Sequence, residues 1–469
     1  MAQSSHALAR QWGKLWGKGH ETITNDLRRI ISVQGSGATT YLQGLVTSNL
    51  MEPPPPPKDY VQLWQEGLEV PPNDAPMEDN MPISFNPALR ATCFLDQKGR
   101  IVTDAFLWTL SPTNQQQQQQ QYLIDVPSTT ATALMQHLTH YKLRRSQITL
   151  EDVTDKVSSH VVYGTYNSQG APPGFHVGMD PRHPSLGMRV ISMDHDPTVL
   201  SNLLSSVFPP CPGTYNVLRI LGGIAEGSEL TGKTALETNQ EWLNAVSFQK
   251  GCYLGQELTA RSMHTGIIRK RVLPIILVDP QLEIPRPWIL ANQRQEGRGD
   301  LLASQGVLSH PSPLPNLSMS SLGGLMGMLT GHGLDDVEGD EKRKVLQEQS
   351  ELHMQSLEES VLPGVNLVDM GGKTIGQIMS KPAPGTFCVL AQLRLDKTGL
   401  TEGDNWSRMN KIKVGDKVFR YLPYTPLWWP RVDKTTGKQL IEPEPELPPL
   451  MEVNGNDEEE VTETEDVKL

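Results

Sequence analysis

Apolar residues alternate with polar ones, or form short unbroken runs, in many segments that end at glycine and other turn residues. Such runs predict β-strands, because successive side chains of a strand point to opposite faces of a sheet. Residues 129–141 follow a helical spacing instead, and two apolar runs around the turn Asp96-Gln97-Lys98-Gly99 predict a hairpin. The expected strands are Ile30–Val33, Ala91–Leu95, Ile101–Leu107, Tyr122–Val126, Val161–Tyr163, Met188–Ile191, Arg269–Val278 and Phe387–Ala391, and the other expected helices are Ala38–Leu45, Tyr215–Leu221 and Gln256–Ser262.

At 469 residues the chain is long enough for two or three domains and a large core. Pro274 interrupts the apolar run of its strand, which places it at a sheet edge or a bulge. Short strands with glycine turns near the C-terminus predict a small β-barrel. Trp428 and Trp429 are expected in its core or against a neighbouring domain.

Low-complexity segments interrupt this pattern. Five consecutive prolines, Pro53 to Pro57, lie in the irregular stretch 52–87, and a run of seven glutamines lies within 113–121. A proline run is extended and lacks amide donors, so we expect both segments to be surface insertions. Residues 291–360 are polar and rich in Ser, Gly and Met, which predicts a mobile insertion with a helix over 341–357.

The formal net charge of −12 is concentrated at one end of the chain, since residues 441–469 hold eleven acids and one lysine. Such a tail, 431–469, is expected to be disordered, and the nearly neutral remainder gives no indication of nucleic-acid binding. No apolar run is long enough for a transmembrane helix. The first twenty residues contain Arg10, Lys14 and Lys18 but no acid, which is typical of a mitochondrial presequence remnant, here 1–24.

The four cysteines are Cys93, Cys211, Cys252 and Cys388, and none are paired at C-x-x-C spacing. This argues against a disulfide scaffold and against a self-contained zinc or iron–sulfur site. A reducing compartment fits this usage.

The densest group of unusual residues is Phe248-Gln249-Lys250-Gly251-Cys252-Tyr253-Leu254-Gly255-Gln256-Glu257-Leu258-Thr259-Ala260-Arg261. Its glycines predict a sharp loop that presents Cys252 before a helix. Glu257 and Arg261 are spaced for an ion pair on one helical face. Lys250 and the helix N-terminus are expected to lower the pKa of the Cys252 thiol, although Lys250 could also be solvated and Cys252 could be a buried structural cysteine.

This motif resembles the signature of the YgfZ-type branch of the folate-binding, glycine-cleavage T-protein superfamily. The resemblance covers the ordered parts of residues 25–280, and its eukaryotic members are the most similar. Further segments fall in the family's order, namely Tyr41–Asn49, Gly99–Ala105, Asp180-Pro181-Arg182, Arg219 with Gly223–Gly227, and Glu237-Thr238-Asn239.

The resemblance implies a three-lobed α+β fold around a central cavity, with two interleaved lobes and a C-terminal β-barrel. The implied divisions are 25–150 for the first lobe, 151–240 for the second, 241–280 for the signature motif returning to the first lobe, and 281–430 for the barrel.

The eukaryotic members of the branch are mitochondrial matrix factors that mature [4Fe–4S] proteins together with A-type carrier proteins. The resemblance therefore implies an assembly factor rather than a turnover enzyme, with no firmly bound cofactor. Cys252 would be a ligand of a [2Fe–2S] or [4Fe–4S] cluster shared with a partner, because no second ligand is near it in sequence. The supporting signature residues are Lys250, Gly251, Tyr253, Gly255, Gln256, Glu257 and Arg261.

The alternative is a tetrahydrofolate-dependent one-carbon transferase or a folate-binding regulatory protein. Asp104 would then act as the base, Arg100 or Arg261 would bind the glutamate tail, and Asn239 would line the cavity. Leu221 stands where T-proteins carry the glutamate that holds the pterin, and this departure speaks against folate. A thiol redox role or an accessory role in tRNA modification is a third alternative.

Overall fold

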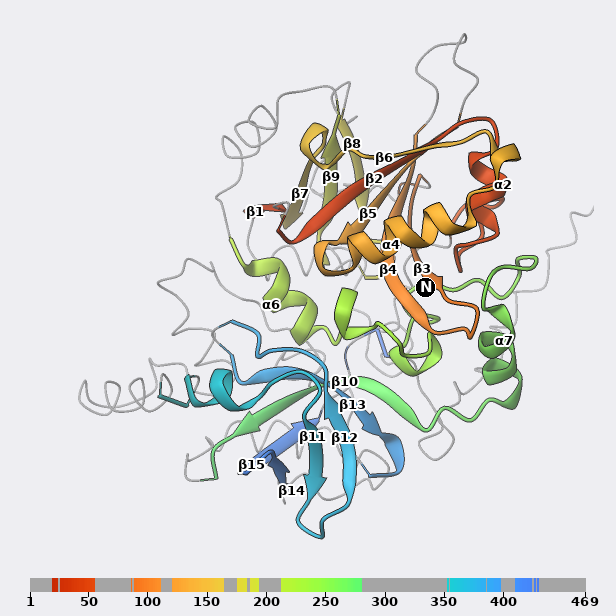
Figure 1. Ribbon diagram of the computed structural model, residues 1–469. Coiled ribbons are helices and arrows are strands. Elements are labelled where there is room, and N and C mark those ends of the chain that lie inside the picture. The colour runs from red at the N-terminus through yellow and green to blue at the C-terminus, as the bar shows by residue number, and fades with distance from the viewer. Residues whose placement is uncertain are drawn as a thin grey trace, which may run out of the picture.

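The structure is a computed structural model, and three sheets organise it (Figure 1). Among the described residues, no helix is long and apolar enough to cross a membrane. The residues that the structure describes are 19–23, 26–54, 86, 88–110, 120–163, 175–183, 186–193, 212–280, 352–353, 355–384, 386–397, 410–423, 426 and 428–429.

The first sheet is antiparallel, with the strand order β3-β4-β5-β2-β6. The expected hairpin is confirmed as β3 and β4, with a register shift between Phe94 and Leu95. Alternate residues face opposite ways, so Ile31 and Leu107 pack under helices α2 and α4, whereas Ile30 and Phe106 face away from them. The bounds are β2 Arg28–Gln34, α2 Ala38–Gln43, β3 Leu89–Leu95, β4 Ile101–Leu110, β5 Gln121–Pro127, α4 Ser128–Tyr141 and β6 Thr149–Asp152.

The second sheet has the order β1-β7-β9-β8 and packs on the face of the first sheet that the helices leave open. Its strand β1 lies within the segment 1–24 that the sequence assigns to a presequence remnant, yet it pairs with β7 along its whole length. Since β1 precedes the first sheet in the chain, the two lobes are interleaved. The bounds are β1 Gly19–Ile23, β7 Ser158–Tyr163, β8 Phe175–Met179 and β9 Met188–Ser192.

The expected C-terminal barrel is confirmed as a closed barrel with the order β10-β13-β12-β11-β14-β15. Pro274 pairs within the continuous ladder to β13 but lies one residue before the pairing with β15 begins. It therefore occupies a locally unpaired side of β10, as its missing amide hydrogen requires. The bounds are β10 Lys270–Val278, β11 Asn366–Asp369, β12 Thr374–Ile378, β13 Cys388–Arg394, β14 Asn410–Val414 and β15 Lys417–Pro423.

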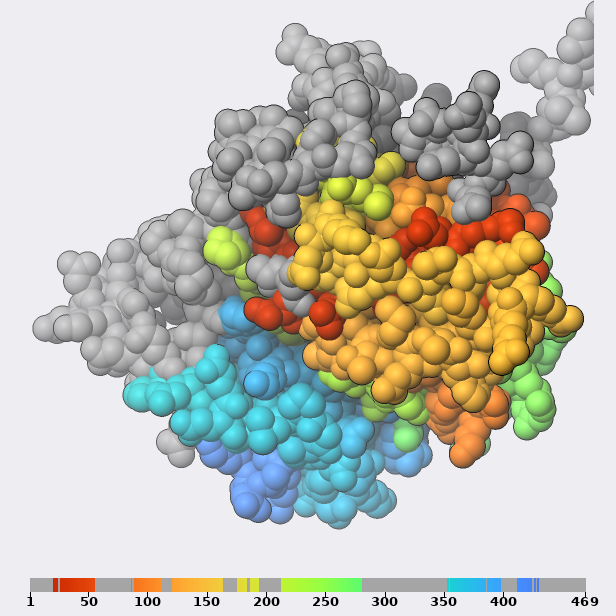
Figure 2. All heavy atoms as spheres, turned by 45° about the horizontal axis from the view of Figure 1, so that its top comes forward, coloured from red at the N-terminus to blue at the C-terminus, as the bar shows by residue number. Residues whose placement is uncertain are grey.

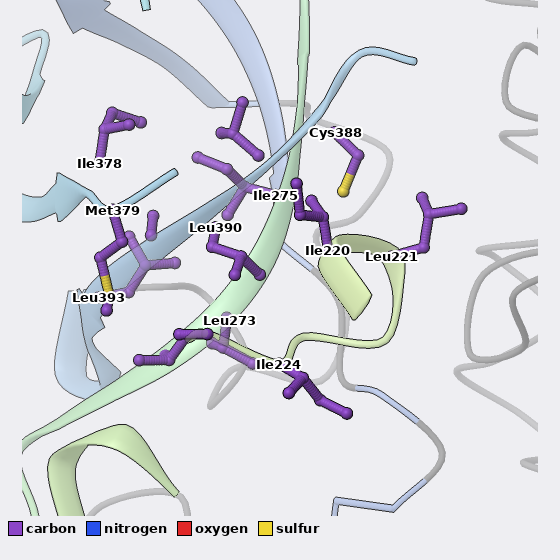
Figure 3. Packing of buried hydrophobic residues seen from close by; sticks show 14 of the residues in the cluster. Ile220, Leu221, Ile224, Leu273, Ile275, Ile378, Met379, Cys388, Leu390 and Leu393 are labelled. Carbon is purple, nitrogen blue, oxygen red and sulfur yellow. The ribbon is translucent and has the colours of Figure 1, made fainter. Parts of the chain in front are cut away.

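Helix α6, Thr214–Leu221, joins the barrel to the sheets. Figure 3 shows side chains of α6 and its C-terminal turn in one buried cluster with barrel residues. Trp428 is buried and its indole Nε1 donates to the Gly222 carbonyl at 2.6 Å, while Trp429 packs edge-on against Trp242. Both tryptophans thus pack against the connection between the barrel and the sheets, as expected.

The end of the predicted mobile insertion 291–360 is packed rather than mobile. Residues 355–360 are helical, Leu357 is fully buried against the barrel core, and His353 bonds the Leu277 carbonyl. Burial of the apolar Leu357 side chain in the barrel core removes it from water, and this stabilises the packed helical stretch. The remaining expectations for 291–351, and those for 55–85, 113–119 and 431–469, lie outside the described residues.

Helix α7, Gln256–Thr265, follows the signature loop and extends beyond the expected end at Ser262 to a left-handed Gly266. It lies at the edge of the molecule, while α4 forms part of a broad surface (Figures 1 and 2). Short 3₁₀ turns complete the fold as η1 Arg144–Ser146, η2 Thr154–Lys156, η4 Gly227–Glu229, η5 Leu236–Thr238 and η8 Leu395–Lys397.

Candidate functional site

The Cys252 loop is tied by backbone hydrogen bonds to the segment that follows α2. The Leu254 amide donates to the Gly44 carbonyl at 2.9 Å, and the Ser247 amide donates to the Thr47 carbonyl at 2.9 Å. These bonds lie on either side of Cys252. The two ends of the loop are therefore fixed to the first sheet, although the partners are 200 or more positions apart in sequence.

Lys250 anchors the same loop. Its Nζ donates to the carbonyls of Gln43 at 2.7 Å, Val46 at 2.6 Å and Ser48 at 3.1 Å. An ammonium group has three donors, so all of them are directed at the backbone carbonyls after α2. Burial lowers the pKa of Lys250 to about 8. Lys250 is therefore neither a solvated charge nor a group free to bond the Cys252 thiolate.

Two glycines allow the β3–β4 turn to approach the loop closely. Gly255 has a φ of +76°, and a Cβ there would lie 2.4 Å from the Asp96 carbonyl oxygen. Gly99 has the same φ, and its Cβ would lie 2.6 Å from the Leu258 Cβ. Neither position accepts a larger residue without movement. Gly251 is different, because its φ is not in the left-handed region and a Cβ would meet nothing within 4 Å.

Cys252 is exposed, whereas Cys93 and Cys388 are buried, and Cys211 lies outside the described residues. Burial raises the pKa of the Cys93 thiol well above its ordinary value, which leaves that thiol protonated. The interpretation of Cys252 as a buried structural cysteine is wrong. Within the described ranges, no group of three or more His, Cys, Asp or Glu side chains could hold a metal ion.

The start of α7 is organised by Gln256 and by the expected ion pair. The Gln256 side-chain oxygen accepts from the Tyr253 amide at 3.2 Å, which folds the loop onto the helix. Glu257 and Arg261 form the expected pair at 2.5 Å, with both side chains more than half exposed. An exposed pair of this kind adds little stability, so these two side chains remain available to a partner.

A buried ionic cluster between the two sheets was not found by sequence reasoning. Arg28 pairs with Asp125 and with Glu226, Arg182 pairs with Glu226 and Asp180, and Arg189 pairs with Asp180. The Tyr215 hydroxyl donates to Glu226. One signal was available, because Asp125 and Arg189 are charged residues inside apolar strands, and such residues need a buried partner.

The three arginines of this cluster stack on one aromatic ring. The guanidinium carbons of Arg189, Arg182 and Arg28 lie 3.6, 4.5 and 4.8 Å from the centroid of the Phe106 ring. The negative face of an aromatic ring stabilises a cation where water is excluded. Phe106 therefore helps to keep like charges close together between the sheets.

Asp104 lies on β4 beside this cluster and opposite Cys93 on β3. Its carboxylate accepts from the Gly227 amide at 2.7 Å. Burial, followed by the charge of Glu226, raises the pKa of Asp104 to about 6. Burial alone would raise the pKa of Glu226 too, but Arg182 and Arg28 hold it well below its ordinary value. Asp104 is thus the carboxyl group here that can gain a proton near neutral pH.

The residues assigned to a folate cavity have different environments. Arg100 is exposed on the β3–β4 hairpin, and Arg261 is exposed on α7 in its pair with Glu257. Asn239 is fully buried, and its amide nitrogen donates to the Val272 carbonyl at 2.9 Å. Leu221 lies in the hydrophobic core that α6 shares with the barrel.

Comparisons with known proteins give a consistent relationship. No family model matches the chain. Two relatives named "Iron-sulfur cluster assembly factor IBA57 homolog, mitochondrial" are those of Pyricularia oryzae, 34% identical over 54% of this chain and 56% of the relative, and Aspergillus oryzae, 31% identical over 58% and 64%. The relative of that name from Aspergillus clavatus is 28% identical over 68% of both chains. The match thus spans somewhat more than half the length of the first two relatives.

Among solved structures, the glycine cleavage system aminomethyltransferase T from Bartonella henselae superposes with a TM-score of 0.48 and 10% identity. It covers 92% of this chain and 91% of that chain. The sequence relationship is the more specific finding, and by it this chain is a homologue of the mitochondrial iron–sulfur cluster assembly factors named IBA57 homolog.

Proposed function

We propose that this chain acts in iron–sulfur cluster assembly in the mitochondrial matrix, as an assembly factor rather than a turnover enzyme. The names of its relatives support the process and the organelle. Cys252 supplies one thiolate to a [2Fe–2S] or [4Fe–4S] cluster that an A-type carrier protein holds jointly, for delivery to [4Fe–4S] proteins. The cluster is the cargo of this reaction, and the other ligands come from the carrier.

The observation that carries this proposal is the exposure of Cys252 on an anchored loop. Backbone bonds to Gly44 and Thr47 fix the loop at both ends, and Lys250 adds a third anchor. A thiol presented in this way reaches a group on another protein with little further ordering of the loop. Low conformational cost on binding favours a stable shared ligand.

The experiment is anaerobic mixing of the full chain with an A-type carrier loaded with a [2Fe–2S] cluster, followed by visible circular dichroism. The wild-type chain is expected to form a complex that bears the cluster and changes its spectrum. Cys252→Ser is expected to lose that complex, whereas Gly251→Ala is the matched control, since its added methyl group meets nothing within 4 Å. An unchanged complex with Cys252→Ser would overturn the proposal.

Folate binding has no supporting observation in the described site. Arg100 and Arg261 are exposed to solvent. The Asn239 side chain donates to the Val272 carbonyl, and Leu221 lies in the hydrophobic core. Isothermal titration with tetrahydrofolate is therefore expected to give no binding. If the wild-type chain instead releases or absorbs heat on binding tetrahydrofolate, and Asp104→Asn does not, the result would favour the transferase alternative.

A further inference from the structure

Helix α7 buries little of its own surface. Thr259 is its one fully buried residue, and Leu258 packs beside Gly99 of the β3–β4 turn. Met263 is 49% exposed, and Ile267, just after the helix, is 53% exposed. A surface helix ordinarily turns its apolar side chains toward the core. These two instead face outward at a spacing of four residues.

An exposed apolar side chain also lies on the N-terminal side of Cys252. Phe248 precedes Cys252 by four residues and is 44% exposed. At about 1.5 Å of rise per residue, Met263 lies roughly 10 Å along α7 from the helix start. A specific interface covers about 800 Å² on each partner, so one partner could contact both segments.

Positive charge borders this surface. The β3–β4 turn, which packs on Gly255 and Leu258, carries the exposed Lys98 and Arg100. Two acids, Glu257 and Asp96, lie on the same segments, where Glu257 pairs with Arg261 and Asp96 accepts from backbone amides of its own turn, so the cations outnumber the acids. The exposed cations of the turn, α7 and the start of β10 are Lys98, Arg100, Arg261, Arg269 and Lys270.

From this arrangement we infer that the α7 face is a docking surface for an acidic, cluster-carrying protein. The α7 face is defined as Phe248, Cys252, Met263 and Ile267 with the basic residues Lys98, Arg100, Arg261, Arg269 and Lys270. This inference rests on the proposed function and names the chemistry of the partner's surface. Exposed apolar side chains rimmed by charge have the anatomy of a protein interface.

The charge of the cargo argues for an acidic occupant. A cluster ligated by thiolates is an anion, because the thiolate and sulfide charges exceed those of the iron ions. Positive charge on the segments that flank the Cys252 loop attracts both the cluster and an acidic surface that surrounds it, and it raises the association rate. Met263 and Ile267 then supply the apolar contact that slows dissociation.

The test compares matched pairs of variants in binding to an A-type carrier, with and without its [2Fe–2S] cluster. Met263→Asp is paired with Met370→Asp, which alters an equally exposed methionine in the β11–β12 turn. Arg261→Glu is paired with Arg29→Glu, which also alters a half-exposed arginine in an ion pair. Met263→Asp is expected to weaken binding about tenfold, and Arg261→Glu to slow association severalfold and reduce its salt dependence. Met370→Asp and Arg29→Glu should bind as the wild type does.

The two proposals fail in different ways. Normal binding by Met263→Asp and Arg261→Glu, with loss of the cluster complex in Cys252→Ser, overturns the docking surface and leaves the ligand role standing. Weakened binding by both surface variants, with Cys252→Ser unaffected, overturns the ligand role alone. Equal weakening by the two control variants overturns the docking surface, and so does binding of the α7 face to a second copy of the chain instead of the carrier.

Discussion

At the residue scale, the buried carboxylates between the sheets outnumber the arginines that face them. Asp104, Asp125, Asp180 and Glu226 lie among Arg28, Arg182 and Arg189 in this ionic cluster. One proton would balance these charges. We expect Asp104 to take it, because no arginine in the described part of the chain forms an ion pair with it and its pKa is raised to about 6.

The substitution Asp104→Asn tests this assignment through the pH dependence of stability. The folded pKa of Asp104 lies above the unfolded value of 3.8, so its stabilising contribution is complete below that value and is lost as the pH rises through 6. Asn keeps an oxygen that accepts from Gly227 without the charge. Relative to the wild type, Asp104→Asn should gain about 1 to 3 kcal/mol of unfolding free energy between pH 5 and pH 8.

Chemical denaturation at several pH values measures this gain. Glu226→Gln is the contrasting variant, because it removes a carboxylate that Arg28 and Arg182 bind. It should be destabilising at every pH where the wild type is folded. A constant difference between Asp104→Asn and wild type across pH 6 would contradict the assigned proton.

At the scale of elements, the signature loop and the β3–β4 hairpin form one packed unit. Gly255 and Gly99 meet through their backbones, and Lys250 connects the loop to the end of α2. The glycine pattern in the sequence indicated a sharp loop, and Gly255 confirms it. The pattern did not indicate that Gly255 is needed for a contact with another hairpin while Gly251 is not.

Gly255→Ala should therefore loosen the loop. Its Cβ would lie 2.4 Å from the Asp96 carbonyl, and its φ of +76° is unfavourable for alanine. We expect a loss of about 1 to 3 kcal/mol and faster amide hydrogen exchange over residues 250–258. Gly415→Ala separates the effect of backbone strain from that of the close contact. Gly415 also has a positive φ, +59°, but a Cβ there would meet nothing within 4 Å. An equal loss in both variants would show that close contact at Gly255 is unimportant.

At the scale of the whole molecule, the barrel is joined to the two sheets through the turn after α6. The Trp428 indole donates to the Gly222 carbonyl, and Gly223 leaves room for Pro426 and Pro274. The adjoining core combines residues of α6 with residues of the barrel strands (Figure 3). The barrel and the sheets are thus expected to unfold cooperatively.

Trp428→Phe measures this connection. It removes a buried hydrogen bond and part of a buried ring, so we expect a loss of about 2 to 4 kcal/mol in unfolding free energy. Trp108→Phe is the matched control, because Trp108 is equally buried but its Nε1 has no hydrogen-bond partner within the described part of the chain. Trp108→Phe should lose about 1 kcal/mol less unfolding free energy than Trp428→Phe, because it breaks no hydrogen bond. Equal losses would show that the bond to Gly222 contributes nothing to stability.

The sequence by itself determined most of the local elements and the C-terminal barrel, and it singled out Cys252 as the candidate site residue. Strand and helix periods depend on residues a few positions apart, and the motif around Cys252 is contiguous. Only the tertiary structure decided which charges are buried together, since Arg28 and Glu226 are 198 positions apart. It likewise placed β1 in the second sheet and turned Lys250 toward α2. Those outcomes depend on which strands and loops meet in space, and no local pattern encodes that.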